Sequence, residues 1–189
     1  MRTHTVIVSA VVLLMLAVVA DHAGAQDPPY PATFVLSSAS RVRCLDREAR
    51  RLMEVAIAAS PTIARQVTDL QSTDLIVGIE THFFQKKSLK GETRIIAATP
   101  DVRHVRIRIG IPGAQPDLVS VLGHELRHAL EIAAASDVRD TASQRAHYLR
   151  IGYDPLGRGY YETDAALEAG RRVSAELAAS QPDRRGAAR

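Results

Sequence analysis

The 189-residue chain has no tryptophan and a single cysteine, and aromatic residues make up only 4% of it. Because a disulfide needs two thiols, the lone Cys44 excludes one within the chain. Cys44 falls in an apolar pattern typical of a helix, so we expect a small buried side chain there rather than a nucleophile. The formal net charge is +3, but scarce aromatic residues and the lack of a nucleic-acid-binding motif argue against a nucleic-acid partner.

Long apolar segments are also lacking, apart from one near the N-terminus. The run over 6–20 follows Arg2 and is shorter than the about 20 residues that a membrane-spanning helix needs. The sequence Ala-Gly-Ala at 23–25 then supplies the small residues that signal peptidase recognises. We therefore predict a signal peptide over 1–25, export to the periplasm or the medium, and no stable membrane span after cleavage. An uncleaved anchor is the alternative.

The rest of the chain is long enough for one domain with a hydrophobic core. The proline-rich segment 26–39 is expected to be an extended lead-in. Residues 40–179 are predicted to form the domain, and 180–189 a disordered basic tail in solvent. The sequence predicts no oligomeric state.

The spacing of apolar residues predicts helices on both sides of a group of strands. Helices are predicted over 40–60, 61–70, 117–135, 137–150 and 161–179. Ser60, followed by proline, is predicted to cap the second of them. The helix over 137–150 is expected to turn Val138, Ala142, Ala146 and Leu149 inward. Strands are predicted over 74–83, 92–99 and 102–111. Strict alternation of apolar and polar residues from Val105 to Ile109 is typical of a strand with one buried face. This order indicates an α+β fold with a small antiparallel or mixed sheet.

The segment VLGHELRHALEIA places two histidines and a glutamate on an otherwise apolar helix. His124 and His128 are four residues apart, so both imidazoles project from one side of the helix. On a helical wheel, Glu125 falls within the apolar arc, where a carboxylate is costly unless it is paired or hydrogen-bonded. This is the HExxH arrangement, in which the histidines bind one Zn²⁺ ion and the glutamate serves as general base toward water on the metal.

Over 121–133 the chain resembles the zincin metallopeptidases. The resemblance implies a zincin-like fold, in which a small sheet lies over the active-site helix, other helices flank it and the edge strand binds substrate. It makes His124 and His128 zinc ligands and Glu125 the catalytic base. The resemblance also implies that the protein cleaves peptide bonds.

Zincins differ in their third ligand. The metzincin pattern needs glycine and histidine at the positions held by Glu131 and Ala134, so that group is excluded. A later glutamate, as in gluzincins, is left, although the neighbouring residues usual in gluzincins are absent. Glu162 heads an apolar stripe of the last predicted helix. Glu168 is expected on the solvent-facing side of that helix, and Glu131 on the solvent-facing side of the motif helix. We predict Glu162 as the third ligand; the alternative is a first-turn glutamate favoured by the helix dipole.

The evidence that other polar residues bind the metal or the substrate is weaker. His147 is a rival ligand but is expected to be exposed, and His82 and His104 are expected to be solvated strand residues. Three tyrosines before Glu162 are candidates to stabilise an oxyanion, with aromatic packing as the alternative. They are Tyr153, Tyr160 and Tyr161.

Taken together, these residues predict an exported hydrolase with one Zn²⁺ ion, acting as a metallopeptidase on a peptide or protein substrate. Two alternatives stay open. One is an envelope-associated metal-binding or interaction domain without catalysis. The other is a zinc amidase that acts on a cell-wall peptide.

Overall fold

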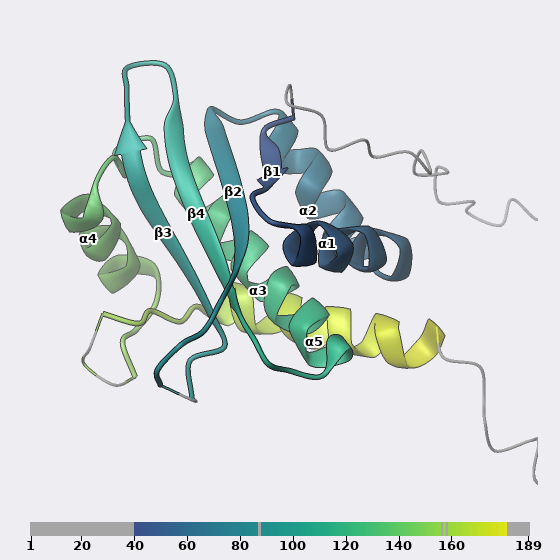
Figure 1. The fold of residues 1–189 in the computed structure, drawn as a ribbon. Helices are drawn as coiled ribbons and strands as arrows, with labels where there is room; N and C mark the ends of the chain where they lie inside the picture. The colour runs from purple at the N-terminus through teal and green to yellow at the C-terminus, as the bar shows by residue number, and fades with distance from the viewer. Residues whose placement is uncertain (1–39, 87, 156, 158, 181–189) are drawn as a thin grey trace, which may run out of the picture. The chain divides into compact units, whose positions relative to one another are not determined.

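The computed structural model describes residues 40–86, 88–155, 157 and 159–180. They form an α+β fold, as predicted (Figure 1). The elements are β1 (Val42–Cys44), α1 (Arg47–Ala59), α2 (Pro61–Gln71), β2 (Leu75–His82), β3 (Gly91–Ala98), β4 (Arg103–Gly110), α3 (Gln115–Ala134), α4 (Thr141–Ile151) and α5 (Asp164–Ser180). The predicted signal peptide, the lead-in and residues 181–189 of the tail lie outside this part of the chain. Within it, no helix is both long and apolar enough to cross a membrane.

The sheet is mixed and has the strand order β1-β2-β4-β3. Strands β1, β2 and β4 run parallel to one another, whereas β3 pairs antiparallel with β4 and forms an edge. In β4, the side chains of Val105, Ile107 and Ile109 are buried while those between them are half-buried. The alternation predicted from the sequence is therefore confirmed, and one face of the sheet meets solvent.

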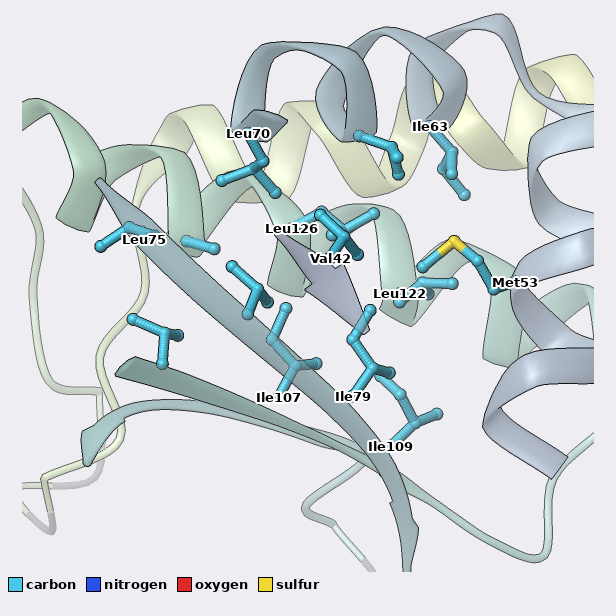
Figure 2. Packing of buried hydrophobic residues seen from close by; sticks show 14 of the residues in the cluster. Val42, Met53, Ile63, Leu70, Leu75, Ile79, Ile107, Ile109, Leu122 and Leu126 are labelled. Atoms are coloured by element: carbon cyan, nitrogen blue, oxygen red, sulfur yellow. The ribbon is translucent and has the colours of Figure 1, made fainter. Parts of the chain in front are cut away.

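The core lies between the other face of the sheet and the helices. Figure 2 shows Ile79, Ile107 and Ile109 on the sheet side, facing Leu122 and Leu126 of α3 on the helix side. All five side chains are fully buried, and each such burial stabilises the fold by about 1.5–3 kcal/mol. Helix α3 also packs against α2 and α5, so the helix that carries the HExxH motif is the central element of the domain.

The helix predicted over 40–60 begins later than expected. Asp46 caps α1 by accepting a hydrogen bond from the N–H of Ala49, so the helix starts at Arg47. The residues before it instead form β1, which pairs with β2, and Cys44 is a strand residue rather than a helical one. Burial raises the pKa of the Cys44 thiol to about 11, so it stays protonated at neutral pH. The cap at Ser60, followed by Pro61, is confirmed as the start of α2.

Helix α4 turns a different face inward from the one predicted. It begins at Thr141, after an Asp140 cap, and Leu149 is 56% exposed although its apolar character suggested the inner side. Ala142 and Ala146, also predicted to face inward, are exposed as well. The buried face consists of Gln144, His147 and Tyr148. Gln144 bonds to Thr93 and Ile95, and Tyr148 to His128, so hydrogen bonding outweighs apolar periodicity here. His147 lies on the same buried face, and the prediction that it is exposed is wrong.

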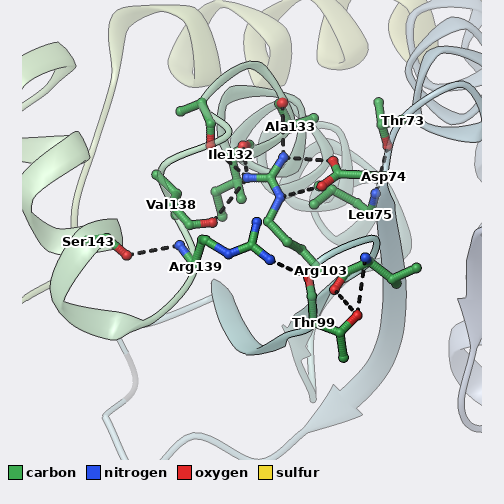
Figure 3. A network of polar contacts seen from close by, with 12 residues as sticks. Thr73, Asp74, Leu75, Thr99, Arg103, Ile132, Ala133, Val138, Arg139 and Ser143 are labelled. Carbon is green, nitrogen blue, oxygen red and sulfur yellow. Dashed lines mark hydrogen bonds and ion pairs between the residues drawn. The ribbon is translucent and has the colours of Figure 1, made fainter.

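Arg103 fixes the C-terminal end of α3 to the sheet (Figure 3). Its side chain is 1% exposed and bonds to both carboxylate oxygens of Asp74, each at 2.7 Å. These bonds hold the pKa of the Asp74 carboxyl below its usual range. The guanidinium also donates to carbonyl oxygens at the end of α3 and just beyond, which a helix leaves without internal partners. They belong to Ile132, Ala133, Ala135 and Val138.

Helix α5 begins at Asp164, not at residue 161. Thr163 caps it by accepting a hydrogen bond from the N–H of Ala166, which leaves Glu162 outside the helix. The predicted stripe of small residues is confirmed, because Ala166, Ala169, Gly170 and Val173 are buried. This stripe packs against α3. A Cβ added at Gly123 would meet Val173 Cγ2 at 2.6 Å, so the two helices approach closely there.

Candidate metal centre

Two imidazoles and one carboxylate converge above α3. The Nε2 atoms of His124 and His128 are 3.1 Å apart, and Nε2 of His124 lies 3.5 Å from Oε2 of Glu162. One ligand atom from each residue can be chosen so that all three lie within 4.8 Å of one another. Two ligands at 2.0–2.1 Å from a tetrahedral zinc ion are about 3.3 Å apart. Two separations in the group, 3.1 and 3.5 Å, are therefore close to those of ligands around one ion.

The chemistry of these atoms also fits a cation. Oε2 of Glu162 is buried and has no hydrogen-bond partner among the residues that the structure describes. Nδ1 of His128 lies 2.8 Å from the Glu131 carboxylate. If Nδ1 carries the proton of that bond, Nε2 of His128 presents a lone pair. Two nitrogens and a carboxylate oxygen form a donor set that zinc accepts, and an ion between them would satisfy the orphaned oxygen.

Glu162 reaches the centre from a bridge rather than from a helix. Its backbone N–H and C=O exchange hydrogen bonds of 2.9 and 3.0 Å with Tyr153 in an isolated antiparallel bridge. The prediction that Glu162 heads the stripe of α5 is therefore wrong, because the Thr163 cap starts that helix two residues later. Its side chain nevertheless faces His124.

Glu125 lies buried next to the histidines, as the helical wheel predicted. Thr93 on β3 donates a hydrogen bond of 2.6 Å to Oε2 of Glu125 and a longer one to its backbone carbonyl. Burial raises the pKa of Glu125 to about 7. A carboxyl with a pKa near neutral can both take and return a proton, which is what a general acid–base catalyst needs.

Strand β3 approaches this carboxylate closely at Gly91. A Cβ added there would lie 2.7 Å from Cγ1 of Val121 and 2.8 Å from Cδ of Glu125. Real Cβ atoms essentially never come this close to other heavy atoms. The edge strand can therefore lie against the Glu125 carboxylate only because residue 91 has no side chain.

Glu131 supports the centre from behind, and it is 7% exposed rather than on the wet side as predicted. Its Oε2 atom pairs with His128, while Oε1 accepts a hydrogen bond of 2.7 Å from Thr163. These two partners compensate the burial of its charge. Burial is the largest single influence and opposes ionisation of both side chains. Their mutual bond outweighs it only together with the bond from Thr163 and the neighbouring charges, so the pKa of His128 is raised and that of Glu131 lowered. The spacing of three residues on one helix was the only sequence signal for this pair.

For His124 and Glu162, the other two members of the group, burial is the main cause of the pKa shift. Burial, and secondarily the neighbouring His128, lower the pKa of His124 to about 4, so this imidazole is neutral at physiological pH. A neutral imidazole is the form that binds a metal. Burial raises the pKa of Glu162 above its usual value.

Two cavities reach the centre, and both are lined by His124, Glu125 and Glu162. One, of about 260 Å³, lies toward α4. The other, of about 470 Å³, lies toward α5 and is lined in part by Arg171. The Glu125 carboxylate therefore borders open space on two sides.

The three predicted tyrosines stand in the walls of these cavities. Tyr160 and Tyr161 line the smaller one and Tyr153 the larger. The Tyr161 ring stacks on Tyr148 with centroids 5.5 Å apart, and Lys86 lies over the Tyr160 ring. Aromatic packing therefore accounts for Tyr161 and a cation–π contact for Tyr160, and the role of the three tyrosines toward an oxyanion stays a prediction.

The structure brings together the four predicted residues at the centre of the motif, namely His124, Glu125, His128 and Glu162. The remaining histidines of the described chain, at positions 82, 104 and 147, do not join the group. Comparison of the chain with protein-family models, curated proteins and solved structures gives no match. Its function must therefore be inferred from the geometry of the centre.

Proposed function

We propose that this protein is a zinc-dependent metallopeptidase of zincin type. The observation that carries the proposal is the convergence of His124, His128 and Glu162 beside the buried carboxylate of Glu125, in an open cavity. The arrangement of the sheet supports it, since the edge strand β3 lies directly against that carboxylate. A small sheet over the helix of the motif, with an edge strand at the site, is the layout of the family that the motif resembles.

The number of ligands favours catalysis over a structural role for the ion. Structural zinc sites are closed by four protein ligands, whereas catalytic sites have three and keep one position open. Among the described residues, only His124, His128 and Glu162 form such a group. Zinc held by them would polarise a carbonyl group and make water a nucleophile near neutral pH.

Glu125 has the geometry of the proton carrier in this reaction. Thr93 holds Oε2, so Oε1, the oxygen that points toward Gly91, is the one available to accept a proton. The carboxyl can then donate that proton to the departing amine, as a general acid. Its pKa of about 7 suits both steps. A peptide or protein is the proposed substrate, and the proposal includes export, because the sequence predicts a signal peptide over 1–25.

Zinc analysis and a conservative variant of Glu125 test the proposal. We expect one zinc ion per purified chain, and the same content in Glu125→Gln, which keeps the shape and the bond from Thr93. Hydrolysis of a mixture of peptides should fall by about 10²–10⁴-fold in that variant. Glu162→Ala should lose zinc during dialysis, whereas Asp164→Ala, exposed two residues later, should keep it. A wild-type protein that binds zinc but cuts no peptide would overturn the proposal in favour of a binding domain.

A further inference from the structure

Strand β3 has an edge that no other strand of the described sheet covers. In an antiparallel strand, the N–H and C=O groups of one residue face one neighbour and those of the next residue face the other. Lys90 bonds to Gly110 at the end of β4, so it faces the sheet. Thr93 and Ile95 are bonded from the opposite side, by α4. By this alternation, Gly91, Thr93 and Ile95 all face the outer edge.

Gln144 occupies part of this edge. Its Nε2 atom donates a 2.9 Å hydrogen bond to the carbonyl of Thr93, and its Oε1 atom accepts a 3.0 Å bond from the N–H of Ile95. An extended peptide that adds a parallel strand to a sheet edge makes the same pair of bonds through the N–H and the C=O of one of its residues. The Gln144 side chain therefore takes the place of a peptide unit on the edge. It is buried and is held there by α4, which lies beside β3 in Figure 1.

The part of the edge left open between the start of β3 and the Gln144 bonds is short and adjoins the catalytic carboxylate. It comprises the N–H and C=O of Gly91 and the N–H of Thr93, which receive no hydrogen bond from another described segment. A strand rises about 3.3 Å per residue, so this stretch spans about 7 Å, or two residues. Thr93 bonds to Glu125 and Gly91 lies against it. A peptide can therefore form ladder bonds only immediately beside the reacting group.

The two cavities beside Glu125 also differ in size, and the smaller one lies on the side that Gln144 blocks. The one on the Gln144 side measures about 260 Å³, which is less than the about 300–1,000 Å³ of common ligand sites. The one on the α5 side measures about 470 Å³. A chain can thus continue through the wider side, whereas on the other side Gln144 stands where the chain would have to extend along β3.

We propose that Gln144 blocks the edge of β3, so that the site takes peptides whose chain end lies within about two residues of the bond to be cut. This inference rests on the proposed peptidase function and narrows it from peptides in general to chain ends. A long internal segment would have to displace both Gln144 bonds before it could lie along the strand. Gln144 is thus a specificity-determining residue.

Cleavage positions in a peptide mixture test the inference. The zinc-loaded full chain is incubated with synthetic peptides of four to twelve residues, with free or blocked ends, and the products are identified by mass spectrometry. We expect the wild type to cut within about two residues of one end, and the blocked peptides to reveal which end. Gln144→Ala should raise the share of internal cuts at least tenfold. Leu149→Ala, an exposed position on the same helix, should leave the positions unchanged.

The outcomes separate the two proposals. A wild type that cuts internal bonds as readily as terminal ones, or a Gln144→Ala protein with unchanged positions, overturns the role of Gln144 while the peptidase function stands. A zinc-loaded wild type that cuts no peptide overturns both. If Gln144→Ala does not fold, Gln144→Asn replaces it, because its shorter amide cannot reach both Thr93 and Ile95, and the same shift toward internal cuts is expected.

Discussion

The Nδ1 atom of His128 lies 2.8 Å from Oε2 of Glu131, and the other oxygen of that carboxylate accepts a hydrogen bond from Thr163. Glu131 therefore joins His128, a proposed ligand on α3, to the residue that follows Glu162, the proposed third ligand. A carboxylate on the far nitrogen of a ligating histidine fixes the ring's tautomer and orientation. We infer that Glu131 is a positioning residue for two of the three ligands at once.

Replacement of Glu131 by glutamine should weaken zinc binding without unfolding the protein. Loss of such a supporting carboxylate costs about 10–100-fold in metal affinity. The measurement is a competition titration of zinc between the protein and a chromophoric chelator, with Glu168→Gln as the control because Glu168 is exposed on α5. Equal affinities for wild type and Glu131→Gln would show that the His128 ring is held by other contacts.

The close approach at Gly91 predicts a loss of catalysis with zinc retained. An alanine methyl would collide with Val121 and Glu125, and we expect peptide hydrolysis by Gly91→Ala to fall at least tenfold while its zinc content stays at the wild-type level. Gly170→Ala is the matched control, since its Cβ would meet its nearest neighbours at an ordinary 3.5 Å. Full activity in Gly91→Ala would mean that β3 can move away from the carboxylate at little cost.

Arg103 should be among the most sensitive positions for stability. Arg103→Met leaves four carbonyl oxygens and the half-exposed Asp74 carboxylate without their donor. Because leaving buried acceptors unsatisfied costs about 1–3 kcal/mol, we expect a loss of at least that size. Arg150→Met removes a pair with Asp137 in which both side chains are exposed, and should cost less than about 1 kcal/mol. Urea unfolding of the two variants measures both values. A similar small effect in each would contradict a clamp at the end of α3.

The pKa of Glu125 predicts a pH dependence of stability in the metal-free protein. The folded-state pKa of about 7 is above the ordinary value of 4.5, so the stability that this carboxyl contributes is complete below 4.5 and is lost as the pH rises through 7. Glu125→Gln should therefore be more stable than the wild type at pH 8, by on the order of 3 kcal/mol, and the difference should disappear near pH 4. Urea unfolding in the presence of a chelator measures it. A constant difference across this range would contradict the shift.

Local patterns were sufficient for much of the site. The spacing of His124, Glu125 and His128 and the apolar residues around them predicted their shared helix and the burial of the glutamate, because both depend on helical periodicity alone. Strands β2, β3 and β4 were predicted to within about one residue at each end for the same reason. These features are set by neighbours in the sequence.

What the sequence did not predict depends on contacts between distant segments. No sequence pattern distinguishes Thr93, Glu131 and Gln144 from other polar residues. Their hydrogen bonds at the site form only when β3, α3 and α4 pack together. The three residues of β1 are a strand only because β2 pairs with them. Glu162 was selected from a helical wheel, yet its placement is due to the bridge with Tyr153, which no local periodicity encodes.

The tight crossing of α3 and α5 at Gly123 extends the list of irreplaceable positions beyond those that touch zinc or substrate. Any side chain at residue 123 must push Val173 aside, and α5 is anchored just after Glu162. In a saturation library screened for zinc retention, substitutions at 123 should therefore be depleted much as at the adjacent His124. The substitutions that this protein tolerates would thus be limited by the close approach of α3 and α5 as well as by the proposed reaction.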